Sequence, residues 1–290
     1  MISSIFLIFI FSLASANTVQ AQRNDNTVSM GDPIISTSAG YSFWSLIVGS
    51  GSGYGVYRDL GTAPFRYKGL FIQPDFGLEF RPSHSLWAFS LVGTTSVGLF
   101  ENAPEPDYNF NAFDITNTFR IKAIKYINRY WDINIFIGAA LTNFLDVTVN
   151  PNYENAAAGV SDFAGPEIIA RGEKDFGYSN WKCHAEMGLM PFAAVLRPGY
   201  AYIDNYTATQ PVSASILDNY EWNLKPLAGL STDIGFDVAT GPGSRISFSY
   251  CWTYYSSGNS GYWRFDHVRH MLLIDFVINL VTKRECIVIE

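Results

Sequence analysis

Apolar and polar residues alternate through most of this chain. In residues 69–80, Leu70 and Phe76 share one face, whereas Gln73, Asp75 and Glu79 share the other. A period of two marks a β-strand, because successive side chains of a strand point to opposite faces. The segment therefore predicts a strand that lies between an apolar and a polar environment.

The same alternation recurs along the chain and predicts an all-β fold. Clear runs occupy 69–80, 87–99, 113–122, 131–142, 183–195, 222–237, 245–254 and 269–280, and weaker runs occupy about 43–57 and 199–207. Strands of globular proteins average about 5 to 6 residues, whereas a tilted strand needs about 9 to 11 to cross a bilayer. The long runs favour a transmembrane β-barrel with its apolar face toward lipid and its polar face toward the lumen. A soluble secreted β-sandwich is the alternative.

The predicted connections alternate between short and long. The short ones are 82–85, 127–130, 197–199 and 239–244, and the long ones are 58–65, 102–109, about 148–180, 207–218 and 256–262. Outer-membrane barrels have short periplasmic turns and long extracellular loops, so both chain ends should lie in the periplasm. Two ends on one side require an even number of strands. The runs predict a single antiparallel barrel of ten strands; eight or twelve strands, and a plug formed by 39–49, stay open.

Residues 1–21 predict a secretory signal peptide. The apolar run from Ile5 to Leu13 is too short to span a bilayer as a helix, and small residues follow it. We therefore expect a periplasmic segment over 22–38, an outer-membrane barrel over 39–282 and a periplasmic tail over 283–290. The expected location is the outer membrane of a Gram-negative bacterium.

Three prolines conflict with fully paired strands. Pro74, Pro191 and Pro226 lie within predicted strands, yet proline has no N–H to donate to a neighbouring strand. All three fall on the outward face, which favours bulges at these positions.

The chain resembles bacterial outer-membrane β-barrel proteins, in particular the secreted barrels common in Bacteroidetes. The resemblance rests on a signal that ends in "AQ", on amphipathic runs such as "RISFSYCWTYY" and on the final strand "MLLIDFVINLV". It implies outer-membrane lipid and the barrel-assembly machinery as partners, and leaves a surface or periplasmic protein partner open. Barrels of this kind usually end in an aromatic residue, whereas "TKRECIVIE" follows the last strand here.

Composition narrows the function classes further. The net charge is −7 and no basic patch occurs, which argues against nucleic-acid binding. Cys183, Cys251 and Cys286 are far apart and form neither a disulfide framework nor a zinc site. Phosphate-binding loops and the HExxH motif are absent from the sequence, so we expect no cofactor and no metal.

Two inward-facing pairs are the candidates for chemistry. His184 and Glu186 lie two residues apart on one predicted strand, and His267 and Arg269 on another, and both pairs are expected near the outer rim. A carboxylate can orient a histidine as a general base. Neither pair has the serine or the Asp-x-His spacing of barrel hydrolases, so a non-enzymatic barrel is favoured over a hydrolase that acts on lipid or peptide at the outer rim.

The polar face carries charges of both signs. The residues predicted to face the lumen are Asp75, Glu79, Asp114, Arg120, Lys122, Asp132, Asp233, Asp237, Arg245 and Asp275. A ten-stranded barrel is narrow, and an unpaired charge inside it is costly. The sequence therefore predicts a lumen largely filled by paired side chains, in a protein that acts as a narrow pore, a surface-binding protein or an assembly component.

Overall fold

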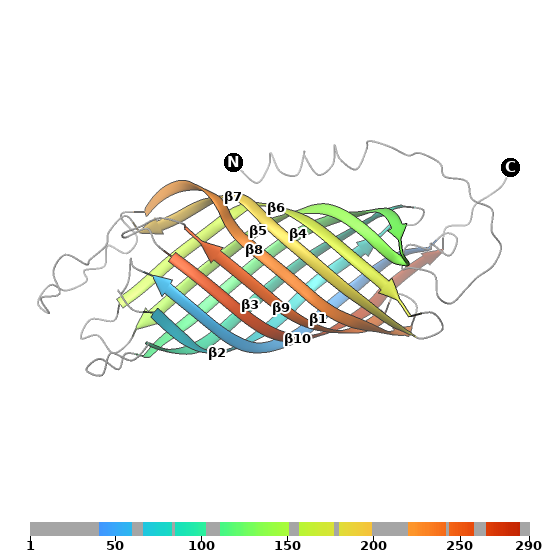
Figure 1. The fold of residues 1–290 in the computed structure, drawn as a ribbon. Helices are drawn as coiled ribbons and strands as arrows, with labels where there is room; N and C mark the ends of the chain where they lie inside the picture. Colours follow the sequence, from blue (N-terminus) through green and yellow to red (C-terminus); the bar gives the residue numbers. More distant parts are fainter. Residues whose placement is uncertain are drawn as a thin grey trace, which may run out of the picture. The chain divides into compact units, whose positions relative to one another are not determined.

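The chain forms a closed antiparallel barrel of ten strands (Figure 1). The computed structural model describes residues 41–59, 66–82, 85–102, 111–150, 157–176, 180–198, 220–241, 244–257 and 265–284. The strands are β1 (Tyr41–Asp59), β2 (Arg66–Arg81), β3 (Trp87–Asn102), β4 (Asn111–Tyr130), β5 (Ile133–Asn150), β6 (Ala157–Asp175), β7 (Trp181–Pro198), β8 (Tyr220–Gly241), β9 (Ser244–Ser256) and β10 (Phe265–Arg284). Each strand pairs with its neighbours in sequence, and β1 pairs with β10. The predicted all-β barrel of ten strands is confirmed.

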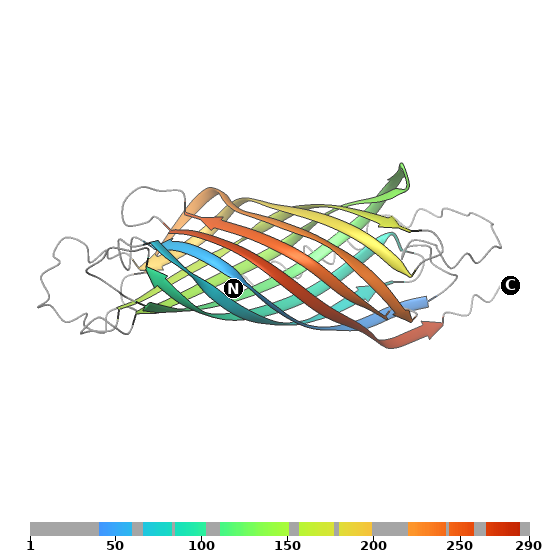
Figure 2. The same ribbon diagram turned by 60° about the horizontal axis from the view of Figure 1, so that its bottom comes forward.

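The strands are long and lean steeply across the barrel wall (Figures 1 and 2). Their lengths run from 13 residues in β9 to 22 residues in β8. Each therefore exceeds the roughly 9 to 11 residues that a tilted strand needs inside the hydrocarbon layer. The described residues contain no helix long and apolar enough to cross a membrane.

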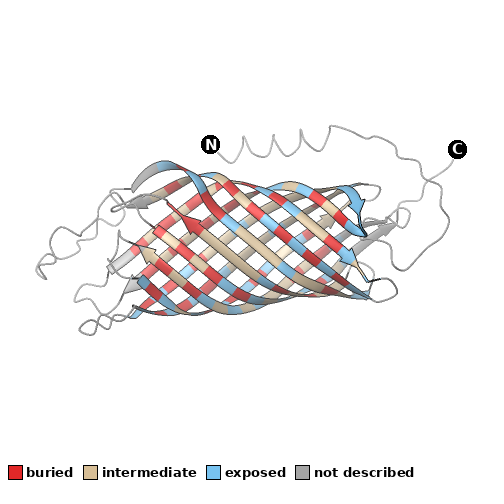
Figure 3. Ribbon diagram, viewed as in Figure 1, coloured by how far each residue is buried: buried red, intermediate tan, exposed pale blue. Residues whose placement is uncertain are grey.

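The outer face of the barrel is apolar, as the alternation predicts. On β2, the side chains of Leu70 and Phe76 are 72% and 60% exposed, whereas Asp75 and Glu79 are buried. Buried and exposed residues alternate along the strands around the wall (Figure 3). An exposed surface of this size and apolarity is stable only against lipid.

The connections define two different ends of the barrel. The residues between strands at the short-turn end are 82–86, 131–132, 176–180 and 242–243, and those at the long-connection end are 60–65, 103–110, 151–156, 199–219 and 257–264. β1 begins and β10 ends at the short-turn end. The predicted alternation of shorter and longer connections is confirmed, but three of the predicted connections are wrong. Residues 127–130 belong to β4, 148–180 is mostly strand, and the short turn expected at 197–199 falls at the long-connection end, where β7 ends at Pro198.

Aromatic side chains surround the outer face near the short-turn end. Trp44 stacks on Phe80 with ring centroids 4.4 Å apart, and Phe236 stacks on both Trp181 (5.3 Å) and Phe248 (4.9 Å). Such a girdle is typical of the level at which a membrane barrel meets the lipid headgroups.

The segment expected to be a long loop over about 148–180 is instead mostly β6. Residues 157–174 pair with β5, residues 162–164 and 168–175 pair with β7, and 176–180 form a short connection. The outward face of β6 carries Asp162, Ala164, Pro166 and Gly172, so its apolar signal is weak. The poor seventh strand expected at 199–207 lies outside the described residues, as do the signal peptide, the segment 22–38 and most of the tail.

Pro74 interrupts one ladder without shifting it. On the β3 side, pairing stops after Ile72–Val97 and resumes at Asp75–Thr94 in the same register, while on the β1 side Pro74 stays opposite Ser50. The missing N–H of Pro74 therefore removes ladder bonds locally and leaves the alternation of faces intact.

Pro191 and Pro226 lie at a true irregularity. The register shifts between Met190 and Phe192 where β7 meets β8, and between Ala164 and Ile168 where β6 meets β7. The shift turns Val195, which was expected on the outer face, into the interior, where it is fully buried. The bulges expected at Pro191 and Pro226 are confirmed, whereas the one expected at Pro74 is wrong, because the register there does not shift.

We predict that a charge on the outer face destabilises the barrel. Phe76→Arg should lower the unfolding free energy in phospholipid vesicles by about 2–4 kcal/mol, because an arginine near the middle of the bilayer loses its hydration. Urea titration followed by tryptophan fluorescence measures it. Phe76→Leu is the control and should change little; an unchanged value for Phe76→Arg would contradict the lipid-facing assignment.

Candidate functional site

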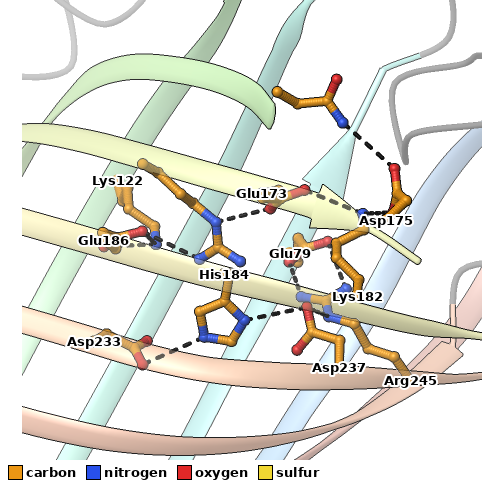
Figure 4. A network of polar contacts seen from close by, with 12 residues as sticks. Glu79, Lys122, Glu173, Asp175, Lys182, His184, Glu186, Asp233, Asp237 and Arg245 are labelled. Atoms are coloured by element: carbon orange, nitrogen blue, oxygen red, sulfur yellow. Dashed lines mark hydrogen bonds and ion pairs between the residues drawn. The ribbon is translucent and has the colours of Figure 1, made fainter. Parts of the chain in front are cut away.

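The interior of the barrel holds a charged network toward the short-turn end (Figure 4). Its side chains come from strands all around the wall, because inward positions of a strand recur at every second residue. The members are Glu79, Arg81, Arg120, Lys122, Glu167, Arg171, Glu173, Lys182, His184, Glu186, Asp233, Asp237 and Arg245.

Glu186 on β7 is the centre of this network. Its carboxylate accepts hydrogen bonds from Lys122 Nζ at 2.9 Å, Arg120 Nη1 at 3.0 Å and Arg171 Nη1 at 3.2 Å. The Glu186 side chain is only 4% exposed. Three cations therefore share one buried carboxylate, which ties β4, β6 and β7 together.

Glu167 on β6 extends the network toward the middle of the lumen. It accepts hydrogen bonds from Arg120 Nε at 2.9 Å, Thr142 Oγ1 at 2.9 Å and Ser231 Oγ at 2.5 Å. Gly188 leaves the space for this arrangement, since a Cβ there would overlap both the Glu167 carboxylate and the Ser231 hydroxyl.

A second set of ion pairs crosses the lumen near the short turns. Glu79 on β2 accepts hydrogen bonds from Arg81 Nε at 2.6 Å and from Arg245 Nη2 at 2.8 Å. Arg245 belongs to β9, which is separated from β2 by β1 and β10. On the other side, Glu173 accepts from Arg171 Nε at 2.8 Å and Lys182 Nζ at 3.1 Å.

His184 lies between two carboxylates of β8. Its Nε2 is 3.4 Å from Asp233 Oδ1, and its Nδ1 is 3.4 Å from Asp237 Oδ2. Both ring nitrogens thus face acids, and neither is left to abstract a proton from a substrate. His184 and Glu186 lie near the short turn 176–180, so their expected position near the outer rim is wrong; the misplaced loop boundary caused the error.

The long-connection end of the lumen is filled by apolar side chains. Phe144 on β5 stacks on Tyr255 of β9 with ring centroids 4.1 Å apart, across three intervening strands. Phe163 and Phe265 pack around this pair, in a buried cluster that also contains Met190, Ala193, Val195 and Ala228. A second buried cluster contains Tyr57, Tyr67, Phe71, Phe100, Ala112 and Met271.

A buried Asp–His–Arg group lies against these clusters. Arg269 Nη2 donates to Asp114 Oδ2 at 3.1 Å, and Arg269 Nε donates to His267 Nε2 at 3.2 Å. His267 Nδ1 is 3.4 Å from Asp146 Oδ1. Atoms of Asp114, Asp146 and His267 that could bind a metal lie within 4.8 Å of one another. Arg269 supplies a positive charge to this group and occupies His267 Nε2.

A cavity of about 260 Å³ lies within the lumen. Its wall combines members of the charged network with aromatic and sulfur-containing side chains, including Asp75, Asp275, Arg120, Phe144, Cys251 and Met271. Cys251 and Cys183 are free thiols. The space is large enough for a few water molecules or one small ligand.

Nine of the ten residues predicted to face the lumen lie in it. Asp75, Glu79, Asp114 and Asp237 are buried, and Arg120, Lys122, Asp233, Arg245 and Asp275 line the cavity. Asp132 does not, because it lies in a two-residue turn with φ of 61° and its side chain is 75% exposed. The prediction placed Asp132 inside a strand that in fact begins at Ile133.

Several charged residues of the lumen were not predicted from the sequence. Glu167, Arg171 and Glu173 belong to β6, which was expected to be a loop. The signal that could have revealed them is the inward series at every second position from Ser161 to Glu173. Apart from Ile168, the outward residues of this stretch are small or polar. Asp146 was missed because the run on β5 was ended at 142.

Comparison with known proteins supports the fold. No family model and no curated protein matches this chain. Among solved structures, the outer membrane protease OmpT from Escherichia coli matches with a TM-score of 0.51 and 8% identity, over 84% of this chain and 98% of that one. The translocator domain of the autotransporter NalP from Neisseria meningitidis matches with a TM-score of 0.40 and 10% identity, over 81% and 88%. The match to OmpT shows that the chain has the fold of an outer-membrane β-barrel.

We predict that Glu186 carries much of the stability of the lumen. Glu186→Gln removes the charge shared by three cations and should lower the unfolding free energy by about 3–5 kcal/mol, since breaking a buried ion pair leaves uncompensated charge. Urea unfolding of the refolded barrel measures this.

The matched control is Asp132→Asn, which removes a carboxylate from the exposed pair with Arg129. Its effect should stay below about 1 kcal/mol. Equal effects of the two substitutions would show that the lumen network contributes no more than a surface pair.

Proposed function

We propose that this protein is an outer-membrane barrel whose lumen is closed by its own side chains, and that it works as a surface-binding protein rather than as a diffusion pore. The observation that carries the proposal is contact across the lumen at two levels. Glu79–Arg245 and Lys122–Glu186 join separated strands at one level, and Phe144–Tyr255 does so at the other.

Each level opposes the passage of a solute for a different reason. A solute at the charged level must separate buried ion pairs, and each separation leaves charges without compensation. A hydrated ion at the aromatic level must shed water among rings that offer few hydrogen bonds. Together the two levels favour a closed state.

The two ends of the barrel differ in the length of their connections, and this difference suggests which end faces outward. Short turns of such barrels lie in the periplasm, so the long-connection end would face outward, where 199–219 is the longest connection. Outer-membrane lipid, the barrel-assembly machinery and a surface or periplasmic protein are the partners we propose. The signal peptide over 1–21 and a Bacteroidetes-like origin belong to the same proposal and rest on the sequence.

A hydrolase at the outer rim is the second candidate. The observation that favours it is the carboxylate of Asp146 beside His267 toward the long-connection end. His267 is 1% exposed and its Nε2 accepts from Arg269, so a substrate would have to displace that contact. Turnover of lipid or peptide that is lost in His267→Ala and retained in His184→Ala would select this candidate.

We predict that removing side chains that cross the lumen at both the charged and the aromatic level creates a conducting pore. Phe144→Ala/Tyr255→Ala/Arg245→Ala removes one lumen-crossing contact at each level, and its single-channel conductance in planar bilayers should exceed that of the unmodified protein several-fold.

The control for this experiment removes similar groups from outside the lumen. Phe236→Ala/Phe248→Ala/Arg129→Ala deletes a stacked pair of the outer girdle and an exposed turn arginine, and it should leave conductance unchanged. Large steady conductance of the unmodified protein would overturn the closed-barrel proposal.

A further inference from the structure

Two acidic residues of the lumen lie on the two strands that flank β1. Asp75 on β2 and Asp275 on β10 are both cross-strand partners of Gly49, from opposite sides. Both line the lumen cavity. The two acidic residues therefore lie on either side of Gly49, which has no side chain to separate them.

Gly49 makes this approach feasible. A Cβ at position 49 would overlap the Asp275 carboxylate and lie too close to the backbone oxygen of Ile274. Because glycine has no side chain, β1 leaves space for the acids and offers no side-chain donor to either of them.

The two acids differ from the other charged groups of the lumen. Asp75 is 2% exposed, and its Oδ1 accepts from Gln73 Nε2 at 2.9 Å. Asp75 Oδ2 and Asp275 Oδ1 are buried and have no hydrogen-bond partner. Within the described ranges, neither acid forms an ion pair, whereas other lumen acids contact an arginine, lysine or histidine nitrogen, namely Glu79, Asp114, Glu167, Glu173, Glu186, Asp233 and Asp237.

Two neighbouring carboxylates in a low-dielectric space repel each other and lose hydration. A positive charge between them removes both costs. Carboxylate oxygens are ligands of hard cations such as Ca²⁺, and they also accept hydrogen bonds from ammonium groups.

We propose that Asp75 and Asp275 form a cation-binding site in the lumen cavity. The bound group is a compact cation, either a hard metal ion or the ammonium group of a small amine, held between the two carboxylates above Gly49. The cavity supplies room for its remaining water or for a short organic chain. The site is independent of whether the barrel conducts.

The test uses the full-length barrel, refolded in detergent and freed of metal with a chelator. Isothermal titration with CaCl₂ and, separately, with methylammonium chloride should show binding of one cation per chain in at least one of the two titrations. Asp75→Asn and Asp275→Asn should each weaken that binding at least tenfold, and Gly49→Ala should weaken it because the new methyl group displaces Asp275. Binding in the CaCl₂ titration would identify a metal-ion site, whereas binding in the methylammonium titration would identify a site for an amine.

Two controls match these variants. Asp132→Asn removes an exposed carboxylate, and Gly93→Ala adds a methyl group where the nearest atom is 3.9 Å away; both should bind the cation like the unmodified protein. Gel electrophoresis of heated and unheated samples verifies that each variant is folded, since a folded barrel and its heat-denatured form migrate differently.

Stability gives a second readout that a purely structural role would not produce. Without cation, Asp75→Asn should unfold at higher urea than the unmodified protein, because it removes like-charge repulsion. With saturating cation, the order should reverse. The proposal would be overturned if neither cation bound, if Asp75→Asn and Asp275→Asn bound the cation as tightly as the unmodified protein, or if Asp75→Asn were destabilised without cation.

Discussion

The pairing of β1 with β10 is the constraint on which the rest of this structure depends. Lipid offers no hydrogen bonds, so every backbone N–H and C=O in the bilayer must find a partner within the protein, and a sheet can achieve this only by closing on itself. The register of that pairing runs from Tyr41–Arg284 to Asp59–Phe265 with a single shift. Closure creates two environments, lipid outside and a narrow enclosed space inside, and each side chain belongs to one of them.

The enclosed space explains why the interior is organised as it is. Ten strands leave too little room for charges to remain separately hydrated, so they share partners, as the three cations around Glu186 do. Where the charges end, rings fill the space between opposite walls. The side chains of the interior therefore pack against one another as in a protein core, although many of them are charged. Among the described residues, Asp75 and Asp275 are exceptional lumen acids because they form no ion pair, and the cation-binding proposal rests on this.

The ten-stranded barrel and most of its lumen-facing residues could be predicted from the sequence. A strand whose two faces meet different environments alternates apolar and polar residues with a period of two. Asp75 was placed correctly for that reason. The alternation is hard to recognise where outward residues are small or polar, as in much of 157–175, and it predicts the wrong face where a bulge changes the phase, as at Val195. Asp132 was predicted to face the lumen because the alternation continues through the two-residue turn 131–132, so that the pattern does not show where β4 ends and β5 begins. The partners of Glu186 were inaccessible, since they depend on how strands distant in sequence meet across the lumen.

The bulge beside Pro191 shows how this barrel can change in length. Between Leu189 and Ala194, β7 has one residue more than the facing part of β6. The extra residue is absorbed by placing Phe192 on the outer face and Ala193 in the interior, so that the remainder of β7 exchanges its two sides. An insertion or deletion of one residue elsewhere in a strand would send lipid-facing residues into the lumen, whereas a change of two would preserve their sides. During evolution, strands of this barrel should therefore gain and lose residues in pairs, and single-residue changes should survive only with a bulge beside them.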